Sequence, residues 1–249
     1  MKMKLVFLAL LVAIGLAGLA GYMYITDDRV EKMNIVLIGP PGSGKGTLAT
    51  RLSDITRLPV LTVSSVLKTA MLTDPELAEN VKVLMDAGKF VSDEIIEQVL
   101  SKELSNPKYQ QGVIFDGFPR TVAQTSFFEK NQLSIDYMVV LEVDPSVIVE
   151  RMAGRRVHLP SGRMYHIINN PPKVENMDDV TGEPLSQRAD DDPSIVKRRL
   201  SDYENLTQPV LSWAKTSLDN HQVVKRMIFV DATQSIEDVF IEVSNQISN

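Results

Sequence analysis

The sequence of 249 residues contains no cysteine, which excludes disulfide bonds, a thiolate nucleophile and a cysteine-ligated metal site. It also lacks internal repeats and low-complexity segments. Its formal net charge is −6, so its overall charge does not indicate a nucleic-acid partner, and a phosphate site has to be built from local lysines and arginines. The remaining composition is ordinary, and the length is sufficient for one large α/β domain with a sizeable core.

Charge is also missing from one long apolar run, Leu5–Ile25, which two lysines precede. A run of this length is typical of a membrane-spanning helix, and the flanking charges then place the amino terminus in the cytoplasm. A signal peptide that is cleaved after Ala20 is the second interpretation. We therefore divide the sequence into residues 1–32, an anchor or signal with a linker, and a folded region, residues 33–249.

The segment Gly39-Pro40-Pro41-Gly42-Ser43-Gly44-Lys45-Gly46-Thr47 carries the strongest functional signal. It follows an apolar run, 35–38, that predicts a buried strand, and it precedes a predicted helix. This is the context in which G-x-x-x-x-G-K-[ST] indicates phosphate binding, here with Gly46 between Lys45 and Thr47. The glycines and the helix N-terminus turn backbone N–H groups toward an anion, Lys45 adds positive charge, and Thr47 can reach Mg²⁺.

Four further apolar runs predict strands at residues 59–63, 112–116, 136–143 and 227–231. Predicted helices lie between them, with N-caps expected at Ser64 or Ser65 and at Ser92. Alternating strands and helices predict an α/β fold with a parallel sheet and helices on both faces, of the phosphate-loop NTPase type. Ligands of such sheets bind at the carboxyl ends of the strands, where the phosphate loop and Asp116 lie.

Residues 154–191 differ from the rest of the chain because turn residues are dense and helical patterns are scarce. This composition predicts a small β-rich insert closed by hairpins, and arginines on both of its borders suit a hinged lid over phosphates. Because a guanidinium group binds phosphate bidentately, the expected phosphate clamp consists of Arg120, Arg151, Arg155, Arg188 and Arg199. The alternative is a solvated basic face paired with Asp190, Asp191 and Asp192.

Asp116 ends a predicted buried strand, and we expect it to hold Mg²⁺ through water; a capping or structural aspartate is the alternative. His166 and His221 are expected to be surface or structural groups. Serine and threonine are poor zinc ligands and cysteine is absent, so no structural zinc is expected in the insert. We expect instead a hydrogen-bonded network that stiffens the lid, formed by His158, Ser161, Asp178 and Thr181.

From about Met33 onward, the chain resembles adenylate kinases of the long-lid, non-zinc type. Beside the phosphate loop, the resemblance rests on Asp-Gly-Phe-Pro-Arg-Thr at 116–121, Gly-Arg-Arg-Val-His at 154–158, Thr-Gly-Glu-Pro-Leu at 181–185 and Gln-Arg-Ala-Asp-Asp at 187–191. It implies reversible phosphoryl transfer from Mg²⁺-bound ATP to AMP, giving two ADP. It also implies a core, a helical region at 62–91 that binds the nucleoside monophosphate (NMP), and a lid at 154–191.

Carried over residue by residue, the resemblance implies three groups of site residues. The ATP-binding residues are Gly42, Ser43, Gly44, Lys45, Gly46, Thr47, Arg151, Arg155, Met164, Tyr165 and Gln234. The AMP-binding residues are Lys68, Lys89, Phe90, Val91, Gly117, Phe118, Pro119, Arg120, Gln124, Arg188 and Arg199. The catalytic residues are Lys45, Arg120, Arg155, Arg188 and Arg199, with Asp116 and Thr47 near Mg²⁺.

One segment departs from the family pattern. Where the family usually has Thr-Gly-Asp and then an arginine three residues later, this chain has Val63-Ser64-Ser65 and Lys68. Val63 offers AMP no hydroxyl, Ser64 puts a side chain where glycine lets the base lie close, and Lys68 lacks the bidentate fork. A lost hydrogen bond to a charged group costs about 1.5–3 kcal/mol, so we expect weaker AMP binding or an altered acceptor, with phosphoryl transfer retained.

Two functions remain open from the sequence. The first is a nucleoside monophosphate kinase, and the second is a membrane-tethered adenine-nucleotide-binding module with weak activity or altered acceptor specificity. The resemblance suggests a cytoplasmic monomer, whereas the apolar run at 5–25 indicates association with a membrane. The anchor or signal would place the folded region outside the cytosol. ATP is scarce there, so this location conflicts with an enzyme that uses ATP.

Overall fold

The computed structural model describes residues 32–86 and 91–248. The predicted anchor or signal at residues 1–31 lies outside these residues, as do the AMP contacts expected from Lys89 and Phe90. Among the described residues, no helix is both long enough and apolar enough to cross a bilayer.

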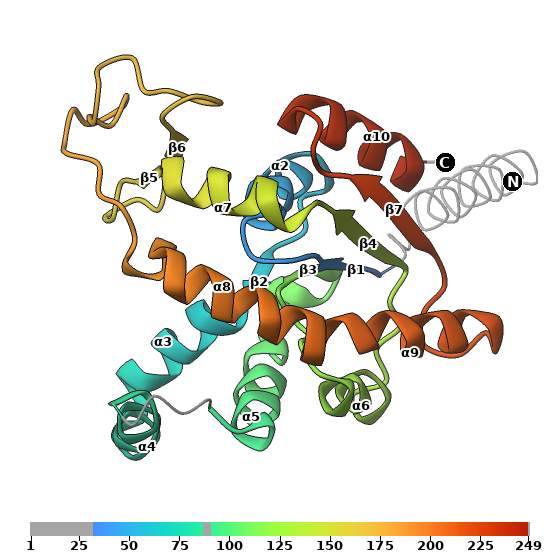
Figure 1. Ribbon diagram of the computed structural model, residues 1–249. Helices are drawn as coiled ribbons and strands as arrows, with labels where there is room; N and C mark the ends of the chain where they lie inside the picture. Colours follow the sequence, from blue (N-terminus) through green and yellow to red (C-terminus); the bar gives the residue numbers. More distant parts are fainter. Residues whose placement is uncertain (1–31, 87–90, 249) are drawn as a thin grey trace, which may run out of the picture. The chain divides into compact units, whose positions relative to one another are not determined.

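A five-stranded sheet in the order β2-β3-β1-β4-β7 forms the centre of the fold (Figure 1). Its strands are β1 (Met33–Ile38), β2 (Val60–Thr62), β3 (Gly112–Asp116), β4 (Tyr137–Glu142) and β7 (Met227–Asp231). Every neighbouring pair in this sheet is parallel, which confirms the predicted α/β class. Leu37 of β1 is the register partner of Asp116, so the phosphate loop leaves β1 at the edge where β3 ends.

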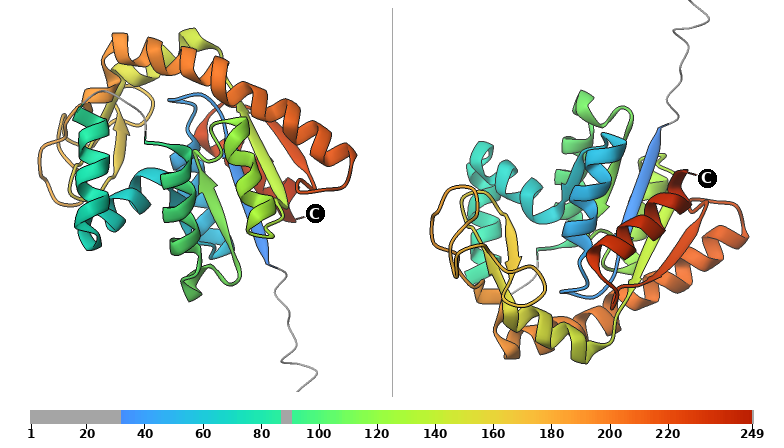
Figure 2. Two further views of the ribbon diagram at one scale, coloured as in Figure 1. Left: turned by 90° about the horizontal axis from the view of Figure 1, so that it is seen from below. Right: turned by 90° about the horizontal axis from the view of Figure 1, so that it is seen from above.

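Alternate residues of the strands enter two different cores, as the two-residue period of a strand requires. On one face, Val36 packs in a cluster with Phe115 and Phe128, and helices α5, α6 and α9 contribute to it. On the other face, Ile35 packs in a cluster with Leu52 of α2 and with residues of α10. Helices therefore cover both faces of the sheet, which Figure 2 shows from below and above.

The helices follow the strands in chain order, as the alternating pattern predicts. They are α2 (Lys45–Thr56), α3 (Val63–Thr73), α4 (Pro75–Asp86), α5 (Asp93–Leu104), α6 (Val122–Lys130), α7 (Pro145–Gly154), α8 (Pro193–Asp202), α9 (Gln208–Asp219) and α10 (Ile236–Ser248). A π-helical turn, Tyr203–Thr207, joins α8 to α9. The predicted N-cap of α5 is confirmed, because Ser92 Oγ accepts a hydrogen bond from the Ile95 N–H.

The start of α3 differs from the prediction. The second strand ends at Thr62, and Val63 already belongs to the helix. Thr62 is the N-cap, because it has an extended backbone and its Oγ1 accepts a hydrogen bond from the Ser65 N–H at 3.2 Å. The prediction of a cap at Ser64 or Ser65 was therefore wrong. The error arose because three hydroxyl-bearing candidates lie near the junction and only the backbone conformation decides between them.

Residues 154–191 contain less regular structure than a β-rich insert implies. Strands β5 (Arg155–Val157) and β6 (Met164–His166) form an antiparallel hairpin, as predicted. Single antiparallel bridges join Val157 to Ser186 and Met177 to Pro184. Turns with positive φ at Gly162 and Gly182 occupy much of the remainder, so side-chain hydrogen bonds have to hold this insert together.

Candidate active site

The segment between β1 and α2 curves around a space that backbone N–H groups line. Gly42 and Gly44 have φ values of 81° and 97°, in the left-handed region that glycine adopts without strain. Gly44 is the N-cap of α2, and no side chain caps this helix. The first N–H groups of α2 therefore point to the loop without a side-chain partner, and with the helix dipole they form a site for an anion.

Lys45 begins α2, and its ammonium group folds back across the loop. Lys45 Nζ donates hydrogen bonds to the carbonyl oxygens of Gly39 at 2.7 Å and Pro40 at 2.8 Å. Burial lowers the pKa of Lys45 to about 8, opposed by Asp116 and reinforced by Arg120, Arg199 and Arg155. Lys45 is therefore charged at pH 7 but short of counter-charge, which an incoming phosphate would supply.

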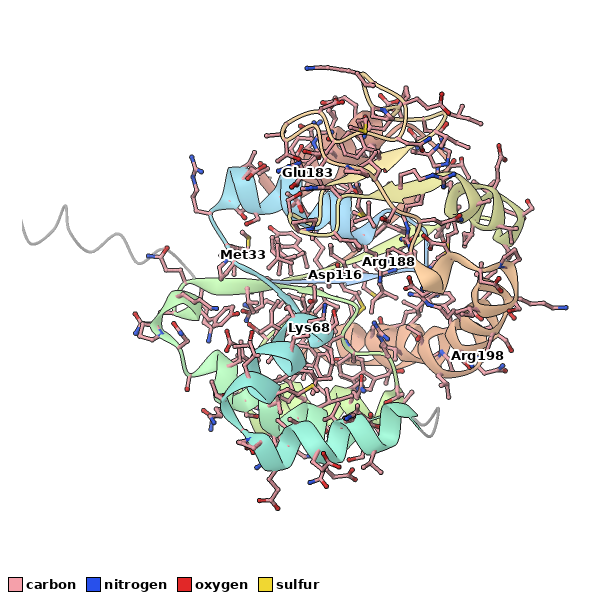
Figure 3. The ribbon with its side chains drawn as sticks, turned by 90° about the vertical axis from the view of Figure 1, so that its left-hand side faces the viewer. Met33, Lys68, Asp116, Glu183, Arg188 and Arg198 are labelled. Carbon is pink, nitrogen blue, oxygen red and sulfur yellow. The ribbon has the colours of Figure 1, made fainter. Side chains whose placement is uncertain are left out.

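Asp116 faces the phosphate loop from the neighbouring strand (Figure 3). A Cβ atom at Gly46 would lie 3.4 Å from Asp116 Oδ2, so the carboxylate lies against Gly46, the residue that precedes Thr47 in the first turn of α2. Burial raises the pKa of Asp116, while Lys45 and Arg120 lower it. A carboxylate and a threonine hydroxyl beside an anion site are the hard oxygen donors that suit Mg²⁺.

The loop after β3 brings Arg120 to the same place. Arg120 Nε donates to the Gly117 carbonyl at 2.9 Å. The Arg120 backbone is held on both sides, because its N–H donates to Gln124 Oε1 at 2.7 Å and its carbonyl accepts from Thr207 Oγ1 at 2.9 Å. Phe118 anchors the loop in the core, where it is fully buried among aromatic rings. The loop is therefore a rigid support for the Arg120 side chain.

Three further arginines are paired with carboxylates at the border of the insert. Arg155 Nε donates to Asp191 at 2.9 Å, and Asp191 is buried. Arg188 binds both oxygens of Asp190, at 2.8 and 2.9 Å, and Arg199 Nη1 donates to Asp190 at 2.8 Å. Although burial opposes ionisation, Arg188 and Arg199 hold the pKa of Asp190 below its ordinary value. These arginines thus have carboxylate partners in this conformation, which phosphates would have to replace.

Asp192, the third aspartate of the predicted pairing, plays a different part. It is the N-cap of α8, and its Oδ1 accepts from the Ser194 N–H at 2.9 Å. The alternative interpretation, in which Asp192 would also pair with the basic face, does not apply to this residue. Pro193 at the first helical position, directly after Asp192, is the sequence signal for this cap.

The other predicted ATP residues lie at the lid and at the end of β7. Arg151 Nη2 donates to the Thr233 carbonyl at 3.3 Å, which places it beside Gln234. Met164 lies over the phosphate loop, since a Cβ atom at Gly46 would be 3.8 Å from Met164 Cε. Tyr165 is buried within the insert, and its hydroxyl donates to Asp178 at 3.0 Å. Met164 therefore faces the donor site, whereas the Tyr165 side chain stabilises the insert.

The predicted hydrogen-bonded network of the insert is present and larger than expected. His158 Nδ1 lies 2.7 Å from Ser161 Oγ, and His158 Nε2 lies 2.6 Å from Glu183 Oε2. Asp178 has a buried side chain and accepts hydrogen bonds from the side chains of Arg163, Tyr165 and Thr181. The pKa of Asp178 is well below its ordinary range, because Arg163 and the Thr181 backbone and hydroxyl stabilise the carboxylate against the cost of desolvation. A charged core thus replaces an apolar core in this insert.

A family model for adenylate kinase matches residues 37–218. This chain belongs to the adenylate kinase family. The matched span runs from β1 into α9, so it includes the phosphate loop, Asp116, the insert and the arginine pairs. The chain therefore carries a nucleoside monophosphate kinase domain.

Several residues that the sequence predicts on the acceptor side of this adenylate kinase domain are exposed. Val63, Ser64 and Lys68 lie in the first two turns of α3, and Ser64 and Lys68 are exposed. Figure 3 labels Lys68 on this helix. The hydroxyl groups of Thr62 and Ser65 bond to each other at 2.8 Å, and Ser65 Oγ also donates to the Thr62 carbonyl at 2.9 Å. These hydroxyl groups serve the helix start, so they do not replace the hydroxyl that Val63 lacks.

Of the remaining residues predicted to bind AMP, the structure describes Val91, Gln124 and Pro119, and Pro119 is buried. Val91 is half-buried and directly precedes the N-cap of α5. Gln124 is only 3% exposed and lies beneath the Arg120 loop, where its Nε2 donates to Asp93 Oδ1 at 2.7 Å. Gln124 is therefore fixed by protein contacts before any nucleotide binds.

The sequence did not single out several residues that shape the site. Asp93 and Thr207 position the Arg120 loop, and Arg163 and Glu183 complete the network of the insert. Asp93 follows the N-cap Ser92, where an acidic residue is already explained by the helix dipole. Thr207 lies in a π-helical turn, which no helical period reveals.

Proposed function

We propose that this chain catalyses reversible transfer of the terminal phosphoryl group from Mg²⁺-bound ATP to AMP, giving two ADP. The observation that carries the proposal is the convergence of charge at the phosphate loop. Four charged side chains from separate elements lie close enough to Lys45 to shift its pKa. They are Asp116, Arg120, Arg155 and Arg199. Such a cluster suits a cleft in which two phosphate groups of high negative charge have to approach each other.

The chemistry needs positioning and charge cancellation more than proton transfer. A phosphate oxygen of AMP forms a new bond to the γ-phosphorus while the bond from that phosphorus to the β-bridging oxygen breaks. ATP⁴⁻ and AMP²⁻ give two ADP³⁻, so no proton has to be taken up or released. The backbone N–H groups of the phosphate loop and Lys45 hold the donor, and Arg120, Arg188 and Arg199 hold the acceptor phosphate and the group in transfer.

Mg²⁺ would be held near Thr47 and, through water, near Asp116, and when bound it neutralises part of the phosphate charge. The insert at 154–191 would close over the donor, with Met164 and Arg155 brought against it. The pairing of Arg155 with Asp191 and of Arg188 and Arg199 with Asp190 supports this, because these carboxylates hold the guanidinium groups in place until phosphates displace them.

The test is a coupled assay of ADP formation from ATP with AMP, GMP, CMP or UMP as the acceptor. We expect turnover with AMP above all others, with a KM for AMP raised by the altered α3 segment. Faster turnover with another monophosphate would reassign the acceptor. Absence of turnover with all four, in a protein that binds ATP, would instead favour an adenine-nucleotide-binding module without useful activity.

A further inference from the structure

The Gln124 side chain is held by two groups of opposite hydrogen-bonding character. Its Nε2 donates to Asp93 Oδ1 at 2.7 Å, and its Oε1 accepts from the Arg120 backbone N–H at 2.7 Å. Asp93 Oδ2 also accepts from Thr121 Oγ1 at 3.3 Å. Thr121 Oγ1 in turn accepts from the Gln124 N–H at 3.2 Å as the N-cap of α6. Asp93 thus connects the first turn of α5 to the loop that carries Arg120.

The orientation of this carboxamide is fixed by chemistry and not only by fit. A carboxylate is an acceptor only, so Asp93 requires the NH₂ group of Gln124. A backbone N–H is a donor only, so Arg120 requires the oxygen. Rotating the carboxamide by half a turn would place donor against donor and acceptor against acceptor. Because Gln124 is 3% exposed, water cannot readily replace the two lost hydrogen bonds.

The same two bonds leave one N–H and one lone pair of the Gln124 carboxamide for a ligand. This edge can donate to a ring acceptor and accept from an adjacent amino group, which is the N1 and 6-amino pattern of adenine. Guanine presents the reverse pattern, with a donor at N1 and an acceptor at O6. Only the rotated carboxamide, which Asp93 and Arg120 both oppose, would match guanine.

We propose that Asp93 is the specificity-determining residue that makes this kinase select adenine over guanine in its monophosphate acceptor. It acts as a positioning residue, because it holds the Gln124 carboxamide in the orientation that matches adenine. The proposal rests on the proposed function, since it concerns the acceptor of that reaction. The proposed function places the acceptor phosphate at Arg120, and the Gln124 carboxamide lies directly beside it, bonded to the Arg120 N–H and to Asp93 of α5.

The first experiment compares kcat/KM for AMP and GMP in the wild type and in Asp93→Asn. The new asparagine can turn its NH₂ group toward Gln124 and donate to it. A Gln124 carboxamide in the rotated orientation would then lose only its hydrogen bond to the Arg120 N–H. We expect the AMP:GMP ratio of kcat/KM to fall at least about tenfold, mainly through the two KM values, with the KM for ATP unchanged. The matched control is Glu97→Gln, which removes the same charge from α5 and breaks the 2.8 Å ion pair to Lys130 of α6. This control should leave the ratio unchanged.

A double variant separates this role from a merely structural one. In Asp93→Asn/Gln124→Glu, the new glutamate accepts hydrogen bonds from both the new asparagine amide and the Arg120 N–H, so the network is restored with reversed polarity. Position 124 then presents only acceptors, which suit the N1–H of guanine and repel N1 of adenine. We expect the double variant to prefer GMP over AMP, with a melting temperature close to that of the wild type. Gln124→Glu alone places two carboxylates together and should lose activity with both nucleotides.

The outcomes distinguish this inference from the proposed function. If the wild type phosphorylates AMP but Asp93→Asn keeps the AMP:GMP ratio within about twofold, the inference is wrong and the proposed function stands. A double variant that folds and still prefers AMP overturns the inference as well. If the wild type phosphorylates no monophosphate at all, the proposed function fails first, and the inference fails with it.

Discussion

The predicted donor and acceptor sides of the site are built in different ways. The donor side lies at the end of a buried strand, with Ser43 3% exposed and Lys45 folded back onto loop carbonyls. The acceptor side lies on the first turns of α3, where Ser64 and Lys68 are exposed. The predicted donor side has the glycines, lysine and threonine of the phosphate-loop motif, whereas the predicted acceptor side departs from the family pattern described above. We therefore expect nucleotide binding at the loop to depend on the core, and acceptor affinity to depend on side chains that can change without disturbing the fold.

The largest effect is expected from Lys45→Met, which removes the charge at the donor phosphates. We expect kcat to fall at least about 10²- to 10³-fold, because one preorganised transition-state contact is typically worth that much. A fall of less than about tenfold would contradict the assignment of Lys45. Lys215→Met, on the exposed side of α9, is the control and should leave kcat unchanged.

The same variant should cost little stability. The folded-state pKa of Lys45 is about 8, below its ordinary value of 10.5. Below pH 8 the charged lysine therefore lowers the free energy of unfolding by about 3 kcal/mol. This penalty disappears as the pH rises from 8 to 10.5. Methionine removes this penalty but leaves two loop carbonyls without their donor. Chemical denaturation at pH 7 should therefore give an unfolding free energy within about 1 kcal/mol of the wild type.

The insert provides the next largest effect, because its centre is charged instead of apolar. Asp178→Asn removes the acceptor shared by Arg163 and Thr181, and trypsin should then cleave after Arg163 or Lys173 at least about tenfold faster. The pKa of Asp178 is depressed, so its contribution is present above the ordinary aspartate pKa and is lost only in strong acid. Glu175→Gln, an exposed residue of the same insert, is the control. Equal cleavage rates in all three proteins would show that the network does not hold the insert.

The pH dependence of binding should separate the two sides. Phosphate groups complete their last ionisation near a pKa of about 6, so changes above a pH of about 7.5 report on the protein. A bound phosphate stabilises the charged form of Lys45, so above pH 8 Lys45 has to take up a proton when ATP binds. The affinity for ATP should therefore fall about tenfold between about pH 7.5 and 9.5. AMP affinity should change much less. Calorimetry at several pH values measures both, and parallel losses would place Lys45 near both nucleotides.

The smallest effect is expected from Lys68→Arg on the acceptor side. Arginine restores a planar fork that binds phosphate bidentately, so the KM for AMP should fall by about three- to tenfold, with kcat and the KM for ATP unchanged. Lys82→Arg, on the exposed side of α4, is the matched control. An unchanged KM for AMP in Lys68→Arg would mean that the acceptor phosphate does not reach α3.

Much of this fold follows from local patterns in the sequence. The apolar runs at 112–116 and 227–231 coincide with β3 and β7. The run at β3 reflects a buried parallel strand, whereas β7 is an edge strand in which Phe229 is exposed. The phosphate loop was predictable because glycine, lysine and threonine have separate physical roles there. The start of α3 was not, because Thr62, Ser64 and Ser65 all resemble caps and only the backbone conformation selects Thr62.

The pairings between distant residues were the part that the sequence could not provide. Asp93 lies 31 residues from Gln124, and Arg120 lies 87 residues from Thr207, so no local period connects them. The aspartates at 190–192 were recognised as possible arginine partners, but their division into two ion-pair residues and one helix cap depends on where α8 begins. Such choices are made by tertiary packing and not by residue type.

The most direct test of the account is calorimetric titration with a bisubstrate ligand, two adenosines joined by five phosphates, in the presence of Mg²⁺. If one cleft holds both nucleotides, the ligand should bind one per chain, compete with both ATP and AMP, and bind much more weakly to Lys45→Met. Binding of two ligands per chain, or competition with only one of the two nucleotides, would contradict the claim that the phosphate loop and the arginines of one site bring donor and acceptor together.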